Sequence, residues 1–143
     1  MKRRDYHNAL IEMGFTNFLS FKEPTDYLGD DVKSIYTFRS GRFHMSVVEP
    51  LDGGQPMDTP ESLLVVLPDV LSASISVRDM SAPFEEDRGF DMDASSIVTE
   101  SLLRRAIYKA GLEFIKKQRE TNPKDIGDLE AAFAKLSKSA VGC

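Results

Sequence analysis

Two histidines, His7 and His44, are the only residues of the type most often used for proton transfer at neutral pH. His44 falls in a predicted strand, and a general-base role would require a partner group within about 3 Å of its ring. The sequence places no such group beside it, and His7 falls in a short terminal helix. We therefore predict that the protein is not an enzyme. A small hydrolase or nuclease centred on His44 is the catalytic alternative.

Metal and cofactor chemistry has no clearer basis in the sequence. The one cysteine is Cys143, and no cluster of histidines and cysteines or H-E-x-x-H pattern occurs. The acids between positions 85 and 93 could attract Mg²⁺ or Ca²⁺, but their spacing differs from that of a calcium-binding loop. The glycines form neither a P-loop nor a dinucleotide-binding fingerprint. We therefore expect no metal and no cofactor.

A basic ridge is the first candidate binding surface. At 100° per residue, four cations of a helix expected over 95–119 fall within about 80° of one another. They are Arg105, Lys109, Lys116 and Arg119. Such a ridge could contact phosphates, which would make the protein an RNA- or DNA-binding regulator. The ordinary alternative is a solvated face that the acidic segment just upstream neutralises.

The polar face of a predicted sheet is the second candidate. It would carry Ser72, Ser74, Ser76 and Arg78 from one strand, and Thr37, Arg39, Arg42 and His44 from a hairpin. Small hydroxyls and arginines on a sheet can contact RNA. Ordinary exposure to solvent is the alternative for this face too.

Residues 33–48 predict a β-hairpin. The strands 33–39 and 42–48 flank the dipeptide Ser40-Gly41, a two-residue connection that favours a tight primed turn. The pairs expected in this register are Phe38 with Phe43 and Tyr36 with Met45 on one face, and Thr37 with His44 on the other. Aromatic cross-strand pairs would fix the register.

The helix expected over 95–119 has apolar residues on two sides. One stripe holds Leu103, Ala106, Ile107, Ala110 and Phe114, and the second holds Ile97, Tyr108, Leu112 and Ile115. A surface helix needs only one apolar stripe, so the second should face another helix or another subunit. A terminal helix over 123–139 could fold back over it or reach a neighbouring subunit as an oligomer arm. We expect a homodimer, with the second stripe as its partner-binding surface.

The remaining segments complete the predicted fold. We expect a helix over Asp5–Met13 closed by Gly14, strands over 15–21 and 71–78, and an acidic loop over 79–94. Residues 60–70 fit a strand or a helix, and we favour a strand. This order predicts a single α+β domain over 1–143, with a mostly antiparallel sheet of three to five strands covered on one face by the long C-terminal helix.

Composition limits the class of protein. A hydrophobic fraction of 41% and a net charge of −5 argue against a wholly disordered chain and against one coated in positive charge. No run approaches the roughly 18 apolar residues of a membrane span, and the start has no apolar core of a signal peptide. With one cysteine, no internal disulfide can form, so we expect a cytoplasmic protein, in its own cell or an infected host.

The function predicted from these observations is a non-catalytic interaction or assembly protein that self-associates or binds an unidentified protein partner. Small size and the lack of a housekeeping motif lead us to expect a phage or another mobile element as its source. An RNA- or DNA-binding regulator that uses the basic ridge is the alternative.

Overall fold

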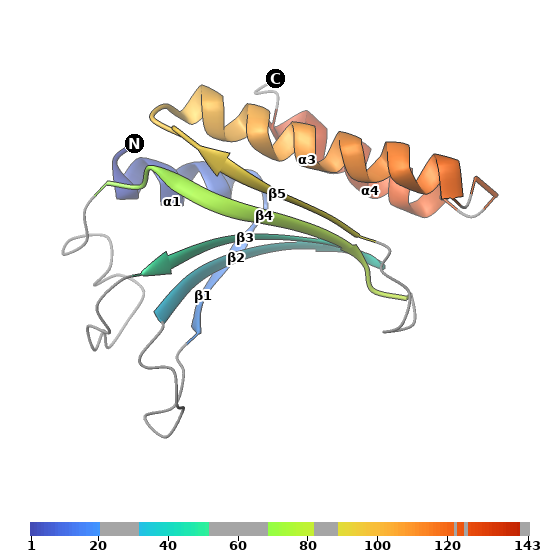
Figure 1. Ribbon diagram of the computed structural model, residues 1–143, viewed down its shortest axis with the longest axis horizontal. Coiled ribbons are helices and arrows are strands. Elements are labelled where there is room, and N and C mark those ends of the chain that lie inside the picture. The colour runs from blue at the N-terminus through green and yellow to red at the C-terminus, as the bar shows by residue number, and fades with distance from the viewer. Residues whose placement is uncertain (21–31, 52–68, 82–88, 122, 125, 141–143) are drawn as a thin grey trace.

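The computed structural model describes residues 1–20, 32–51, 69–81, 89–121, 123–124 and 126–140, and these form two layers (Figure 1). The sheet layer contains β1 (Thr16–Ser20), β2 (Val32–Ser40), β3 (Phe43–Leu51), β4 (Ser72–Asp79) and β5 (Gly89–Ser95). The helix layer contains α1 (Arg3–Glu12), α3 (Glu100–Thr121) and α4 (Gly127–Ala140). The strands lie in sequence order, and each pairs antiparallel with the next. The predicted α+β fold is therefore confirmed.

The end of α1 follows the predicted glycine signal. Gly14 has a φ of +97°, a conformation that favours glycine. Its N–H donates to the carbonyl of Ile11, and the N–H of Phe15 donates to the carbonyl of Leu10. This pair of bonds is the Schellman motif. It turns the chain directly into β1 and directs the buried Phe15 side chain into the core.

The β2–β3 hairpin forms, but in a different register from the one predicted. Ser40 pairs with Phe43, so the loop is Gly41-Arg42 and not Ser40-Gly41. Gly41 has a φ of +59°, and a type II′ turn places glycine at the first loop position. The observed pairs are Phe38 with Met45, Tyr36 with Val47, Thr37 with Ser46 and Arg39 with His44. The predicted faces are correct, because a shift of two residues keeps each side chain on its side.

The prediction of an acidic loop over 79–94 is wrong for its second half. Residues 89–95 form the edge strand β5, in which Phe90, Met92 and Ala94 pack toward the core. Asp91 and Asp93 alternate with them on the other face. Asp91 accepts a hydrogen bond from Arg78, and Asp93 accepts one from Ser74. The carboxylates are therefore part of a strand whose neighbour supplies donors.

The long helix begins later than predicted. Thr99 is its N-cap, since the Thr99 hydroxyl accepts a hydrogen bond from the N–H of Leu102. Ahead of it, the N–H of Ile97 donates to the carbonyl of Leu71, which holds the end of β5 beside the start of β4. Leu71 itself is 61% exposed, so it does not share the core face predicted for the strand over 71–78.

Helix α4 returns antiparallel along α3 in the same chain. Arg119 near the end of α3 pairs with Glu130 near the start of α4, and Arg104 near the start of α3 donates to the carbonyl of Ser139 near the end of α4. Of the two arrangements predicted for the terminal helix, the structure has the folded-back one.

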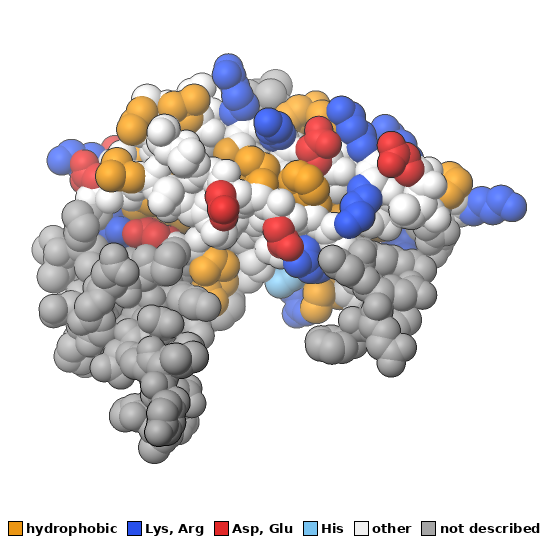
Figure 2. Space-filling view, viewed as in Figure 1, with side chains coloured by type: hydrophobic (Ala, Val, Ile, Leu, Met, Phe, Trp, Pro, Cys, Tyr) orange, Lys and Arg blue, Asp and Glu red, His pale blue; other side chains and the backbone are white. Residues whose placement is uncertain are grey.

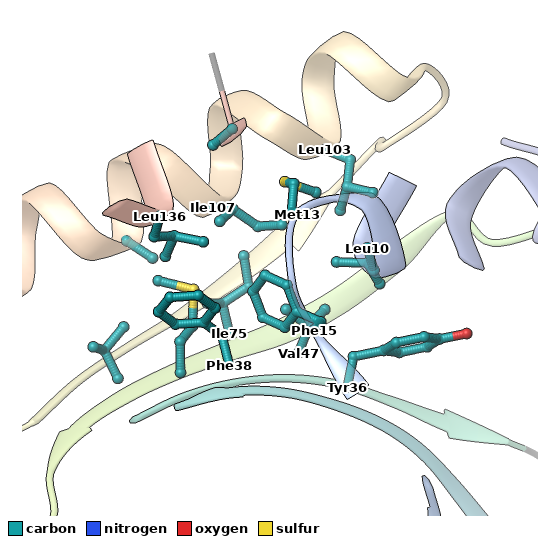
Figure 3. Packing of buried hydrophobic residues seen from close by; sticks show 14 of the residues in the cluster. Leu10, Met13, Phe15, Tyr36, Phe38, Val47, Ile75, Leu103, Ile107 and Leu136 are labelled. Carbon is teal, nitrogen blue, oxygen red and sulfur yellow. The ribbon is translucent and has the colours of Figure 1, made fainter. Parts of the chain in front are cut away.

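The core lies between the layers (Figure 3). Phe43 joins them, because its ring packs at 6.0 Å from the ring of Phe38 in the sheet and at 5.7 Å from that of Phe114 in α3. All described helices lie on this one side of the sheet, and none of them covers its other face (Figure 1). The segment predicted as strand or helix at 60–70 lies largely outside the described residues, which resume at residue 69.

Candidate functional site

The predicted second apolar stripe is only partly a face of α3, because Ile97 precedes the helix, and α4 packs over the helical part of it. Ile97 and Ile115 are only 2% and 1% exposed, whereas Tyr108 is 37% exposed and Leu112 is half-buried. The Tyr108 ring packs against Phe133 of α4, with ring centroids 5.6 Å apart. A partner could reach Ile97 and Ile115 only if the chain rearranged. The homodimer therefore remains a prediction. The exposed apolar stripe on which it was based is mostly buried within the chain.

The four ridge cations are exposed, and they fall into two pairs. Lys116 lies 3.6 Å from a carboxylate oxygen of Glu113, and Arg119 lies 3.1 Å from one of Glu130. Arg105 and Lys109 have no ion pair within the described part of the chain. Charged side chains gather along α3 on the outer surface, with apolar ones among them (Figure 2). The ridge therefore offers two uncompensated cations near the start of α3.

A groove lies beside these cations, between the start of α3 and the end of α4. Its volume is about 650 Å³. It is lined by Glu100, Ser101, Arg104, Arg105, Tyr108 and Ala140. The size falls within the range of roughly 300–1,000 Å³ that is typical of ligand pockets.

The two arginines of the groove have different surroundings. Arg104 is held by structural contacts, since it donates to Glu100 at 2.8 Å and to the Ser139 carbonyl, and it lies 3.4 Å from Glu12. Arg105 is exposed and has no such contact with the described residues. Arg104 is therefore held in the wall of the groove, while the Arg105 guanidinium has no carboxylate partner in the described part of the chain.

Exposed apolar side chains extend this surface. Leu102 is 37% exposed and Val98 is 53% exposed. On a helical projection Leu102 lies about 60° from Arg105 and about 20° from Lys109, whereas Val98 precedes the helix. Neither residue was predicted from the sequence, although Leu102 precedes Arg105 by three residues and Lys109 by seven.

The uncovered face of the sheet is polar, as predicted. Arg39, His44 and Arg78 lie directly opposite one another on three neighbouring strands, and the next row holds Thr37, Ser46, Ser76 and Asp91. Arg42 is a correction, because it does not lie on this face. Its guanidinium binds Asp128 of α4 at 2.8 Å and the buried Asp79 at the end of β4 at 3.1 Å.

The two histidines differ in their contacts. His44 is half-exposed, and burial followed by the neighbouring Arg39 lowers its pKa. In the described ranges, no carboxylate bonds to its ring. The Nδ1 atom of His7 lies 2.7 Å from the hydroxyl of Tyr36, so this ring is tied to the sheet. His44 therefore has no carboxylate partner among the described residues, whereas His7 and Tyr36 form a hydrogen-bonded pair.

A polar cluster under α1 was not predicted from the sequence. Both guanidinium nitrogens of Arg3 donate to the carboxylate of Glu49, at 2.7 and 2.8 Å, and the Arg3 side chain is only 5% exposed. The hydroxyl of Tyr6 is buried nearby without a hydrogen bond, and burial raises its pKa strongly. Glu49 is 46 residues from Arg3 in the sequence, so only the fold brings its carboxylate to α1.

Over the residues that the structure describes, no three histidine, cysteine, aspartate or glutamate side chains are grouped to hold a metal ion. None of the helices found there is long and apolar enough to cross a membrane. Comparison with known proteins adds no relative, because no protein-family model, curated protein or solved structure matches the chain.

Proposed function

We propose that this protein is a non-catalytic binding protein that takes a segment of a protein partner in the α3/α4 groove. The observation that carries the proposal is the groove itself, in which the exposed Tyr108 ring lies beside Arg105, a cation with no ion pair to the described residues. Tyrosine and arginine are among the residues that contribute most to binding at protein interfaces. A rigid helix presents both, so little ordering is needed on binding.

The chemistry of the groove defines the partner segment. Arg105 would bind a carboxylate, because it has no carboxylate partner among the described residues. The exposed Tyr108 ring would pack against an apolar or aromatic side chain next to that carboxylate. The proposed ligand is therefore a peptide segment that carries an acidic residue next to an apolar anchor.

Self-association is the form of the proposal in which the partner is a second copy. The phage or mobile-element origin and the cytoplasmic location belong to the same proposal, supported by the small size and the single cysteine. Sedimentation equilibrium tests whether the protein self-associates. A wild-type protein that stays monomeric over the accessible concentrations would mean that the partner is a different protein.

Selection of displayed random peptides on the immobilised protein tests the groove without knowledge of the partner. We expect enriched peptides to combine acidic and apolar residues and to bind Arg105→Glu and Tyr108→Ala about tenfold more weakly or worse, since a charge-assisted hydrogen bond contributes about 1.5–3 kcal/mol. Lys124→Glu is the matched control, because it makes the same charge change at the other end of the helix pair. Peptides that bind all three variants equally would refute the proposal.

Nucleic acid binding by the ridge is the competing outcome. A mobility shift that weakens steeply with salt and is lost in Arg105→Glu would favour it. The ion pairs of Lys116 and Arg119 argue against it, since they leave only two of the four ridge cations uncompensated.

A further inference from the structure

Strand β5 forms one edge of the sheet, and no described element pairs with its outer side (Figure 1). Backbone groups of successive residues point alternately to the two sides of an antiparallel strand. The two-residue turn makes Ser40 and Phe43 a hydrogen-bonded pair. Counted from this pair through β3 and β4, every second residue of β5 directs its backbone groups at β4, namely Phe90, Met92 and Ala94. The backbone groups of Asp91 and Asp93 therefore face outward.

A contact from α3 agrees with this orientation. The ammonium group of Lys117 donates to the carbonyl of Gly89 at 2.7 Å. Gly89 is two residues before Asp91, so the backbone groups of both point to the same side of the strand. The helix thus provides a donor to the first outward carbonyl of β5. Among the described residues, no backbone group outside the sheet bonds to Asp91 or Asp93.

The core side of this edge has apolar surface that the helices leave partly uncovered. Phe90 and Met92 point toward the helix layer but are only half-buried, whereas Ala94 is buried. A further strand with apolar residues opposite Phe90 and Met92 would remove that surface from water.

The carboxylates on the other face of β5 determine the kind of partner. Asp91 is balanced by Arg78 at 2.8 Å, whereas the described donor to Asp93 is the neutral hydroxyl of Ser74, at 2.9 Å. A second copy of β5 paired antiparallel along this edge would bring its own aspartates opposite or next to these. Like charges in such positions are destabilising, while a basic residue opposite Asp93 is favourable.

We propose that the outer edge of β5 binds an extended segment of a partner protein, which joins the sheet as a further antiparallel strand. The segment carries a lysine or arginine opposite Asp93 and apolar residues opposite Phe90 and Met92. In this mode of recognition the main chain provides affinity, and alternate side chains provide specificity. The edge shares no residue with the α3/α4 groove, so the inference stands independently of the function proposed above.

Amide hydrogen exchange measured by NMR tests the edge and its ligand. In the protein alone, the amides of Asp91 and Asp93 should exchange rapidly, and those of Phe90 and Met92 slowly. The probe is the acetylated and amidated peptide TVKVTVT, whose lysine lies opposite Asp93 in the antiparallel register. Its binding should slow exchange at Asp91 and Asp93 and leave the other two amides as they were.

Modified peptides distinguish main-chain pairing from ordinary charge attraction. N-methylation of the lysine removes an N–H that would face β5, and it should weaken binding about tenfold or more. N-methylation of the valine that follows is the matched control, because its N–H faces away from β5, and it should have a much smaller effect. The peptide TVEVTVT should bind roughly two- to fivefold more weakly than TVKVTVT, since the cross-strand charge pair becomes repulsive.

Two substitutions at one position make the same distinction in the protein. Asp93→Asn keeps the outward N–H and should abolish only the preference for lysine over glutamate. Asp93→Pro removes this N–H, which faces away from β4, and should weaken both peptides about tenfold. Tyr108→Ala, in the α3/α4 groove, should bind TVKVTVT as the wild type does.

Several results would overturn the proposal. One is slow exchange at Asp91 and Asp93 in the free protein, which would mean that the edge is already paired. Others are unchanged exchange at these amides in the presence of TVKVTVT, and equal binding of the two N-methylated peptides. Loss of binding in Tyr108→Ala would place the peptide in the groove instead. If Asp93→Pro does not fold, the N-methylated peptides decide the question, because they use the wild-type protein.

Discussion

Gly111 of α3 lies against Phe133 of α4. Because of this contact, we predict that Gly111→Ala destabilises the otherwise wild-type protein but stabilises a variant that lacks the Phe133 ring. In the middle of a helix, glycine to alanine ordinarily stabilises by about 1 kcal/mol. Here a Cβ would lie 2.5 Å from Cε2 and 2.6 Å from Cδ2 of Phe133, and 3.6 Å from the methyl carbon of Met45. The Phe133 ring would have to move away from Tyr108, against which it packs.

Overpacking of this kind costs about 2 kcal/mol, so Gly111→Ala should lower the free energy of unfolding by about 1 kcal/mol. In Phe133→Ala the ring is absent, and the same change should stabilise by about 1 kcal/mol, which gives a coupling of about 2 kcal/mol between the two positions. Gly127→Ala is the control, because a Cβ there meets nothing within 4 Å and its effect should be the same in both backgrounds.

Urea denaturation followed by circular dichroism measures all these variants, and constant m-values would show that the transition itself is unchanged. If Gly111→Ala stabilises the otherwise wild-type protein as an ordinary helix glycine would, α4 does not pack over this part of α3. That result would refute the inference that α4 covers the second apolar stripe of α3. It would also refute the inference that Ile115 is buried in the core.

Two further predictions concern the buried stripe and the sheet edge. Ile115→Glu should lower the free energy of unfolding by about 3 kcal/mol or more in thermal or urea denaturation, because it places a charge at a position that is 1% exposed, whereas Leu112→Glu should lower it by about 1 kcal/mol. The double variant should therefore unfold. If these two residues instead formed a homodimer interface, the double variant would be a folded monomer. A hydrogen bond from Arg78 holds the pKa of Asp91 below 3.8. The ionised Asp91 therefore stabilises the folded protein fully above about pH 5, and this contribution to the free energy of unfolding is lost as the pH falls through 3.8 and below. In Arg78→Gln, a carboxyl-carbon NMR titration should show the pKa of Asp91 rising towards 3.8, and an unchanged titration would contradict the assignment of this bond.

The parts of the fold that depend on local chain geometry were predictable from the sequence. Gly14 marks the end of α1 because a positive φ is easily reached only by glycine. The alternation of Ala73, Ile75 and Val77 with serines determines which face of β4 is buried, since side chains of a strand alternate between its two faces. The exposure of the ridge cations follows in the same way from the period of the helix.

The sequence of β5 also contains the alternation of apolar and polar residues that is typical of a strand, but its acidic composition favoured the prediction of a loop. Phe90, Met92 and Ala94 alternate with Asp91 and Asp93 as in any strand with one buried face. Acidic residues are unfavourable in strands on average, so the segment reads as a loop by composition. Their cost depends on what lies opposite, and the donors on β4 are known only once the two strands are paired.

Only the tertiary structure decided the register of the hairpin, the cover over α3 and the candidate sites. Shifts by two residues preserve every face, so periodicity cannot distinguish them, and the conformation of Gly41 makes the choice. The stripe with Ile115 needs an apolar cover, but the sequence does not specify whether that cover comes from the same chain or another. The α3/α4 groove and the open edge of β5 likewise exist only in the folded chain, because each is formed by elements that meet through long-range packing.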